Sequence, residues 1–106
     1  MHEPIPADAA RRVRLVVLDV DGVLTDGGVY LGGSGNGEPV ELKRFDITDG
    51  LGVKLLVWAG LRVVLVSGRP SVASRLRAAE LGVECVEEEG ARKLPVVERL
   101  LARFGL

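Results

Sequence analysis

The stretch Val13–Asp26 (VRLVVLDVDGVLTD) decides how this chain is interpreted. Its first eight residues are rich in β-branched side chains and are interrupted only by Arg14 and Asp19. Such nearly continuous hydrophobicity is typical of a strand covered on both faces, as in a parallel sheet. Asp19 and Asp21 fall where this strand ends, and open parallel sheets bind their ligands at the carboxyl ends of their strands.

Two further apolar runs are predicted to be strands of the same sheet, and three segments of helical periodicity separate and follow them. The strands are Leu61–Val66 and Val83–Val86, and the helices are Leu51–Ala59, Val72–Leu81 and a last helix with Pro95 in its first turn. This alternation predicts a right-handed α/β domain, with a Rossmann-like parallel sheet and flanking helices.

Capping residues mark the ends of these helices. Thr48 or Asp49 is expected to cap the first helix, which should end at Gly60. Ser71 is expected to cap the second, which should end at Gly82 and in which three apolar residues share a face: Val72, Leu76 and Ala79. The last helix carries an apolar stripe at helical spacing, made of Val97, Leu100, Leu101 and Phe104.

An insert at about residues 27–47 interrupts the alternation and is predicted to be a β-hairpin. Its strand-like arms, Gly27–Leu31 and Glu38–Ile47, flank the glycine-rich turn 32–37 (GGSGNG). The turn is not a phosphate-binding loop, because no Lys-Ser/Thr pair follows it. In the second arm the apolar pattern shifts after Leu42, which indicates a bulge or a change of partner surface.

Length and charge exclude several classes of protein. The 106 residues, 47% of them hydrophobic, suffice for one domain over 13–106 behind a polar extension at 1–12. A net charge of −1 gives no electrostatic footprint for nucleic acid or for an anionic membrane. No signal peptide and no apolar run of about 18 residues is present, so a cytoplasmic location without membrane association is expected.

The counts of cysteine and histidine restrict the chemistry further. Cys85 stands alone, so no internal disulfide and no cysteine-rich zinc site can form, and a buried apolar role is expected for it. The only histidine is His2, which argues against Ser-His-Asp or Cys-His catalysis. Catalysis would therefore depend on carboxylates, hydroxyls, Lys or Arg.

The carboxylates at the end of the first strand are suited to such chemistry. One of Asp19 and Asp21 could act as a nucleophile and the other as an acid and base. Converging carboxylates repel each other unless a cation lies between them, and hard oxygen ligands suit Mg²⁺. The alternative for a pair at this spacing is a solvated acidic turn that caps a helix.

The motif 19–26 (DVDGVLTD) resembles the first motif of the haloacid dehalogenase superfamily, most of whose members are Mg²⁺-dependent phosphatases. The segment Lys43–Leu56 (KRFDITDGLGVKLL) is similar to the small, capless branch typified by 3-deoxy-D-manno-octulosonate 8-phosphate phosphatase. The resemblance runs from about Val13 to the C-terminus. It implies a role in lipopolysaccharide biosynthesis.

The resemblance implies a role for each residue that matches a motif. Asp19 would be the nucleophile and a Mg²⁺ ligand, and Asp21 would be the general acid and base and would offer its backbone carbonyl to the metal. Ser67 and the Gly68 amide, after the second strand, would bind the transferring phosphoryl group. Arg69 would meet the anionic substrate.

For three further positions an alternative stays open. Lys93 would steady the charge of the nucleophile and the phosphoryl group, with Arg92 as the alternative because the spacing from Gly90 is one residue short. Asp49 and Gly50 would lie near the substrate mouth, or serve only at the start of a helix.

The fourth motif of the superfamily, an acidic pair after another strand, has no match in this chain. The residues Glu87, Glu88 and Glu89 come too early and are expected to form a solvated acidic loop. A sheet with an exposed edge and a metal site without its last protein ligand are therefore expected.

The leading hypothesis is hydrolysis of a small anionic sugar phosphate through an aspartyl-phosphate intermediate, with Mg²⁺ as cofactor. In the branch that the chain resembles, the hairpins pack together in a homotetramer, so the same homo-oligomer is expected here. The alternative is a non-catalytic oligomerisation or regulatory domain, or an inactive fragment. A receiver-like signalling domain is disfavoured, because the third strand lacks an acceptor Asp.

Overall fold

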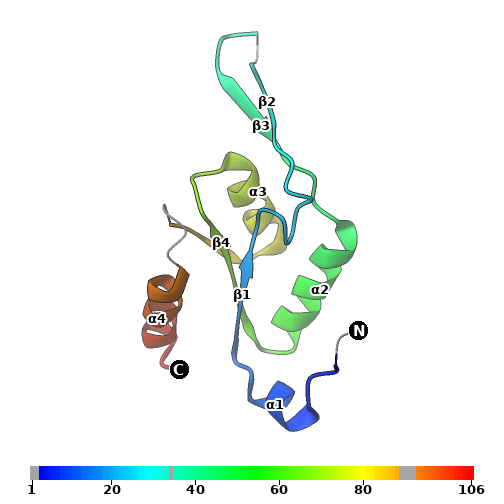
Figure 1. The fold of residues 1–106 in the computed structure, drawn as a ribbon, viewed down its shortest axis with the longest axis vertical. Coiled ribbons are helices and arrows are strands. Elements are labelled where there is room, and N and C mark those ends of the chain that lie inside the picture. The colour runs from blue at the N-terminus through cyan, green and yellow to red at the C-terminus, as the bar shows by residue number, and fades with distance from the viewer. Residues whose placement is uncertain (1–2, 34, 89–92) are drawn as a thin grey trace.

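The computed structural model describes residues 3–33, 35–88 and 93–106, and their backbone confirms the predicted α/β class (Figure 1). The elements follow in the order α1 (Ala7–Arg12), β1 (Leu15–Asp19), β2 (Tyr30–Gly33), β3 (Pro39–Leu42), α2 (Ile47–Trp58), β4 (Arg62–Ser67), α3 (Val72–Leu81), β5 (Glu84–Glu87) and α4 (Lys93–Phe104).

The central sheet is parallel and has the order β1-β4-β5. Its register pairs Asp19 with Val66 and Ser67 with Glu87, so the ends of the three strands meet at one edge. Within the described residues β1 pairs with β4 alone, which leaves its outer edge without a strand partner, as expected. The register therefore brings the predicted catalytic positions of two different strands to the same side of the sheet.

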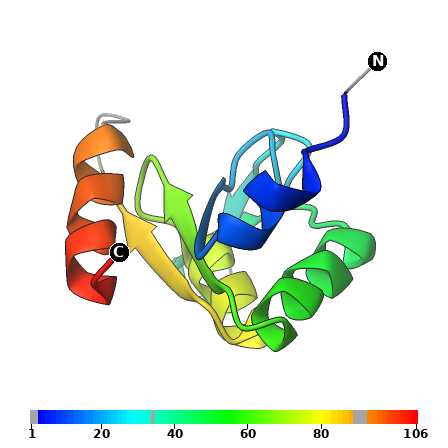
Figure 2. The same ribbon diagram turned by 90° about the horizontal axis from the view of Figure 1, so that it is seen from below.

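Helices cover both faces of the sheet. Successive side chains of β4 point to opposite faces, and both sets pack against helices. Val64 and Val66 pack against Val96 and Leu100 of α4 on one face. On the other face Val63 packs with Val53 of α2 and Leu81 of α3, and Leu65 packs with Ala78 of α3. Figure 2 shows the resulting layers, with α4 on one side of the strands and α2 and α3 on the other.

The N-terminal cap of α2 differs from the prediction. The helix begins at Ile47, and its cap is Asp46 rather than Thr48 or Asp49. The extended backbone of Asp46 allows its carboxylate to accept a hydrogen bond from the Thr48 amide at 2.8 Å. This bond, together with a hydrogen bond from the Thr48 side chain and the positive charge of Arg44, lowers the pKa of Asp46.

The cap of α3 agrees with the prediction, but its buried face does not. Ser71 accepts a hydrogen bond from the Ser74 amide, and Gly82 ends the helix in the left-handed conformation at φ 73°. The predicted face of Val72 and Leu76 is exposed, and Ser74, Ala78 and Leu81 are buried instead. The reason is that the side of α3 facing the sheet carries small residues, whereas Val72 and Leu76 lie along a groove beside the hairpin.

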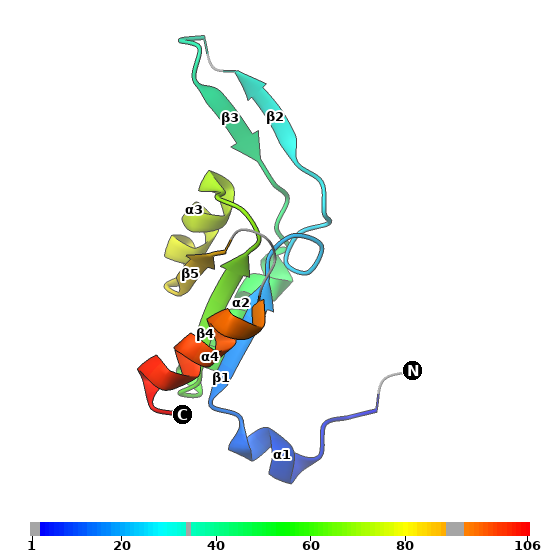
Figure 3. The ribbon, with the colours of Figure 1, turned by 60° about the vertical axis from the view of Figure 1, so that its left-hand side comes forward.

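The hairpin β2-β3 extends beyond the helices and the sheet (Figures 1 and 3). It makes the molecule 53 × 29 × 27 Å in extent, and the radius of gyration of 15.4 Å exceeds the roughly 13 Å of a compact chain this long. The predicted shift after Leu42 lies where the β2-β3 pairing ends. Tyr30 pairs with Leu42, but the next bridge joins Thr25 to Phe45. Residues 26–29 of one arm thus face only residues 43–44 of the other, which bulges the first arm.

The ends and loops of the chain bring two corrections. The polar extension contains the short, exposed helix α1. Glu87 and Glu88 are not a solvated loop, because Glu87 ends β5 and pairs with Arg75, while Glu88 pairs with Arg99. Glu89 lies outside the described residues. Cys85 packs against the core as expected, and burial raises the pKa of its thiol.

None of the helices in the described ranges has both the length and the apolar character needed to cross a membrane.

Candidate active site

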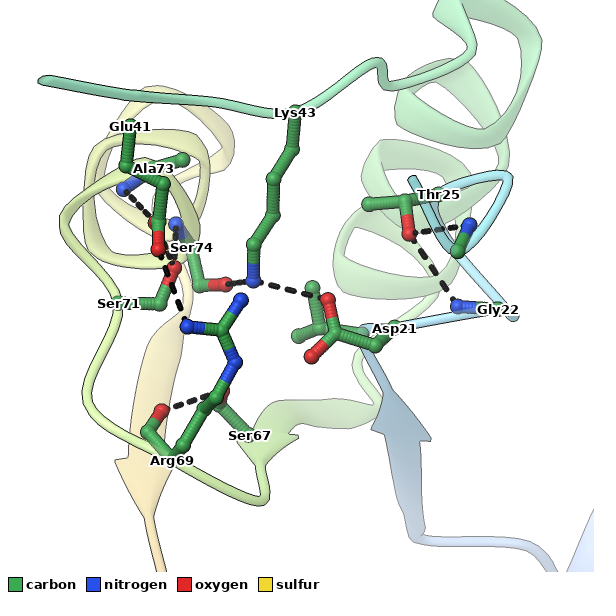
Figure 4. Close-up of polar contacts among 12 residues, drawn as sticks. Asp21, Gly22, Thr25, Glu41, Lys43, Ser67, Arg69, Ser71, Ala73 and Ser74 are labelled. Atoms are coloured by element: carbon green, nitrogen blue, oxygen red, sulfur yellow. Dashed lines mark hydrogen bonds and ion pairs between the residues drawn. The ribbon is translucent and has the colours of Figure 1, made fainter. Parts of the chain in front are cut away.

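The loop after β1 is fixed by its own hydrogen bonds. The Val20 carbonyl accepts from the amides of Leu24 at 2.9 Å and Thr25 at 3.1 Å. The Thr25 hydroxyl accepts from the amides of Gly22 and Gly27 at 3.2 and 3.1 Å (Figure 4). Gly22 has a φ of 80°, which disfavours any residue with a Cβ atom. The loop therefore holds Asp19 and Asp21 in a defined arrangement before any ligand arrives.

Asp19 lies at the end of β1 and pairs with Lys93, at the start of α4. The Lys93 Nζ is 2.6 Å from Asp19 Oδ2, and the Val20 amide donates to Oδ1 at 2.9 Å. The Asp19 side chain is about one-third exposed, so a ligand can still reach it. Of the two candidates for the third motif, Lys93 thus contacts the predicted nucleophile, whereas Arg92 lies outside the described residues.

Asp21 has a partner that the sequence prediction missed. The Lys43 Nζ lies 2.8 Å from Asp21 Oδ1 and donates a hydrogen bond to Ser74 Oγ at 3.1 Å. The Lys43 side chain is fully buried between the hairpin, the β1 loop and α3 (Figure 4). A charged side chain is rarely buried without a partner, and here the partner is the predicted acid and base.

Ser67 ends β4 beside these groups and is fully buried. Its hydroxyl donates to the Arg69 carbonyl at 2.7 Å, and its own carbonyl accepts from the Glu88 amide at 2.9 Å. These bonds fix the turn through Gly68. Because a hydroxyl has only one hydrogen, Ser67 must rotate away from the Arg69 carbonyl to donate to a phosphoryl oxygen.

Arg69 is held by Glu41 of β3, a second residue that the sequence prediction missed. The guanidinium donates to Glu41 Oε2 at 3.3 Å, and the Ser71 hydroxyl donates to Oε1 at 2.6 Å. The Ala73 amide adds a hydrogen bond at 3.3 Å. The Ser71 hydrogen bond and these further contacts lower the pKa of Glu41, although partial burial opposes them. The hairpin is thus joined to the Ser67–Arg69 loop through one carboxylate.

Comparisons with known proteins find relatives of this chain, although no family model matches it. The 3-deoxy-D-manno-octulosonate 8-phosphate phosphatase KdsC of Escherichia coli K12 is 34% identical over an alignment of 108 positions, which covers 99% of this chain and 55% of KdsC. The crystal structure of the Yersinia pestis phosphatase of the same name has a TM-score of 0.79 and 34% identity, over 92% of this chain and 51% of that one.

The chain is a homologue of the KdsC-like phosphatases of the haloacid dehalogenase superfamily. The chain spans about half the length of the curated relatives it matches. A similar structure from Moraxella catarrhalis contains a magnesium ion, a phosphate ion and a KDO molecule. It matches with a TM-score of 0.78 and 30% identity, over 93% of this chain and 55% of that one.

The two residues suggested for the substrate mouth lie at the start of a helix, and their suggested role stays a prediction. Asp49 and Gly50 stand in the first turn of α2, beside Arg77 and Leu81 of α3. A Cβ atom at Gly50 would collide with the Arg77 guanidinium, so glycine permits the close approach of these two helices here. No contact found among the described residues joins either of them to Asp19, Asp21 or Ser67.

The donor atoms at this edge fit magnesium. Asp19 and Asp21 offer hard oxygens, and Mg²⁺ is commonly held by one or two carboxylates, with waters and substrate phosphate completing its shell. No group of three or more His, Cys, Asp or Glu residues that could hold a metal ion occurs within residues 3–33, 35–88 and 93–106. The fit therefore rests on the aspartates alone.

Proposed function

We propose that the chain carries the phosphoryl-transfer site of a Mg²⁺-dependent phosphatase that hydrolyses a small acidic sugar phosphate of the 3-deoxy-D-manno-octulosonate 8-phosphate class. The observation that carries this proposal is the Lys93–Asp19 ion pair of 2.6 Å at the strand edge that also holds Asp21 and Ser67. This edge would thus bring together a nucleophile (Asp19), a cation (Lys93), an acid and base (Asp21) and a hydroxyl donor (Ser67).

The proposed reaction has two steps. A carboxylate oxygen of Asp19 attacks the phosphorus in line with the ester bond, so that an Asp19–phosphorus bond forms as the sugar oxygen departs. Asp21 gives its proton to the departing oxygen. It then takes a proton from a water molecule that attacks the phosphorus of the aspartyl phosphate, which releases inorganic phosphate and restores Asp19.

The surrounding residues stabilise the charge that the reaction moves. Lys93 lies against the Asp19 carboxylate and would steady the anionic phosphoryl group as it arrives. Ser67, the Gly68 amide and Arg69 would bind the remaining phosphoryl and substrate oxygens. The Asp19 carboxylate and the Asp21 backbone carbonyl would hold the Mg²⁺. When bound, that ion would neutralise phosphoryl charge as a Lewis acid.

Phosphate release tests this proposal directly. The protein should release phosphate from 3-deoxy-D-manno-octulosonate 8-phosphate and, more slowly, from p-nitrophenyl phosphate, and chelation by EDTA should remove both activities until Mg²⁺ is restored. Calcium should restore them poorly, because it prefers more ligands at longer distances than Mg²⁺ does. Release that persists unchanged in EDTA contradicts the proposal.

A non-catalytic domain of the same fold is the second candidate. The described residues hold no cluster of three acidic, His or Cys side chains for a metal, which favours this alternative. It predicts no phosphate release from either ester, together with retention of the fold and of self-association.

We also propose that the protein assembles as a homotetramer through its hairpin. Tyr30, Val40 and Leu42 share one face of the hairpin and are 67%, 38% and 60% exposed. The groove of about 590 Å³ between the hairpin and α3 extends this apolar surface to Val72 and Leu76. A two-stranded hairpin is marginally stable alone, so burial against other copies would stabilise it. We place the tetramer in the cytoplasm, where the lone Cys85 would stay reduced.

Light scattering on a size-exclusion column tests this assembly. The wild-type protein should elute with the mass of four chains, and Tyr30→Asp should shift it to a smaller species, because a carboxylate would be buried without a partner. Ile5→Asp is the matched control, since Ile5 is equally exposed but lies in the N-terminal extension. A wild-type monomer, or an unchanged Tyr30→Asp tetramer, contradicts the assembly.

A further inference from the structure

The Lys43 side chain is the most deeply buried charge that the structure describes, and no role was predicted for it from the sequence. It follows β3 on the second arm of the hairpin, yet none of its side-chain surface is exposed. Taking an ammonium out of water costs several kcal/mol before it finds partners. A role that only the charge can fill would explain why a lysine stands here.

The contacts of Lys43 point to Asp21. Its Nζ is 2.8 Å from Asp21 Oδ1, an atom that is itself buried and whose polar contact among the described residues is this ion pair. The Asp21 side chain as a whole remains about one-third exposed. One oxygen of the carboxylate is thus fixed from inside the protein, and the other is left to exchange protons with a ligand.

Attachment of the hairpin alone does not account for this arrangement. Glu41 already joins β3 to α3, through the Ser71 hydroxyl, the Ala73 amide and Arg69. These contacts need no charge on Asp21. Lys43 instead reaches past α3, where it donates only to Ser74, and ends on the β1 loop (Figure 4).

We propose that Lys43 is a positioning residue for catalysis, which holds the Asp21 carboxylate in the orientation needed for proton transfer to the departing oxygen. The inference rests on the proposed function, since Asp21 acts as the acid and base there. It also makes the hairpin part of the active site, because Lys43 and Glu41 come from the same arm and hold Asp21 and Arg69.

The choice of substrate separates this role from a structural one. A sugar alkoxide needs a proton as it departs, whereas p-nitrophenolate departs readily without one. Lys43→Met keeps a stem of similar length but removes the charge. It should lower kcat/KM for the sugar phosphate about 100-fold and for p-nitrophenyl phosphate less than about 5-fold. Lys43→Arg should restore part of the loss, and Lys54→Met on the exposed side of α2 should change neither value.

Two further measurements keep the test decisive. The melting temperature of Lys43→Met should fall by no more than a few degrees, because the Asp21 side chain is about one-third exposed and its freed carboxylate can turn toward water. A high-resolution crystal structure of the variant should show Asp21 in more than one rotamer and Asp19 in one.

Equal losses on both esters, a well-ordered Asp21 in the variant, or full activity of Lys43→Met would overturn the proposal. A wild-type protein that releases phosphate from neither ester overturns the proposed function instead. In that case the rotamers of Asp21 still decide whether Lys43 fixes its orientation.

Discussion

Asp19→Asn is expected to lower phosphate release by on the order of 10³-fold or more, because an amide oxygen is a poor nucleophile and the aspartyl phosphate can no longer form. The substitution keeps the shape of the side chain and its acceptor for the Val20 amide at 2.9 Å. The fold should therefore survive, and a steady-state assay of phosphate release at saturating Mg²⁺ isolates the chemical effect.

The same loop offers the matched control for this variant. Asp26 is exposed and accepts a hydrogen bond from the Gly28 amide, a bond that asparagine can also accept. Asp26→Asn removes the same charge seven residues away and should leave the rate within about 2-fold of the wild type. An Asp19→Asn protein that keeps more than one-tenth of the wild-type rate would show that Asp19 is not the nucleophile.

Lys93→Met is expected to lower kcat by about 10²–10³-fold, the range typical for loss of one preorganised donor to a developing charge. Its Nζ lies 2.6 Å from Asp19 Oδ2, where the phosphoryl group would be transferred. Because the pair is about one-third exposed, stability should change little, and the loss should appear in kcat rather than in the melting temperature.

Lys54→Met serves as the control here as well, since Lys54 is an exposed lysine of α2. It should leave kcat and the melting temperature unchanged. If Lys93→Met kept the wild-type kcat, the cation of the third motif would have to be another residue, and Arg92→Met would then be the variant to measure.

The sequence was sufficient to predict the sheet and several of the residues that lie at its carboxyl edge. Three apolar runs, Val13–Val20, Leu61–Val66 and Val83–Val86, could be recognised without tertiary information, because strands buried on both faces leave a continuous hydrophobic pattern. The parallel register then placed Asp19 beside the end of β4. The prediction of Lys93 over Arg92 agrees with the contact that Lys93 makes.

The roles of the hairpin could not be predicted in the same way. Along β3, Val40 and Leu42 alternate with Glu41 and Lys43, and such a pattern predicts the apolar face inward. The structure has the charged residues contacting the helix and loops, through partners 22 to 32 residues distant in sequence. Only the tertiary arrangement shows this inversion. The alternation of charged and apolar residues that runs from Glu41 into the KdsC-like segment at Lys43 was the available signal.

The corrections in α2 and α3 have local causes. The Asp46 side chain competes with Thr48 and Asp49 for the helix N-terminus and wins because its backbone is extended. In α3, Ala78 packs against Leu65 of β4 and Ser74 is buried under Lys43, while Val72 and Leu76 remain exposed. Helix propensities alone predict neither the cap of α2 at Asp46 nor the buried face of α3.

Trapping the covalent intermediate tests the central claim most directly. The protein is mixed with Mg²⁺ and the sugar phosphate, quenched in acid during turnover and reduced with borohydride, which converts an aspartyl phosphate to homoserine. Peptide mass spectrometry should then find this conversion at Asp19 and at no other aspartate, and only when substrate was present. Turnover without any conversion at Asp19, or conversion at Asp21 instead, would contradict the account.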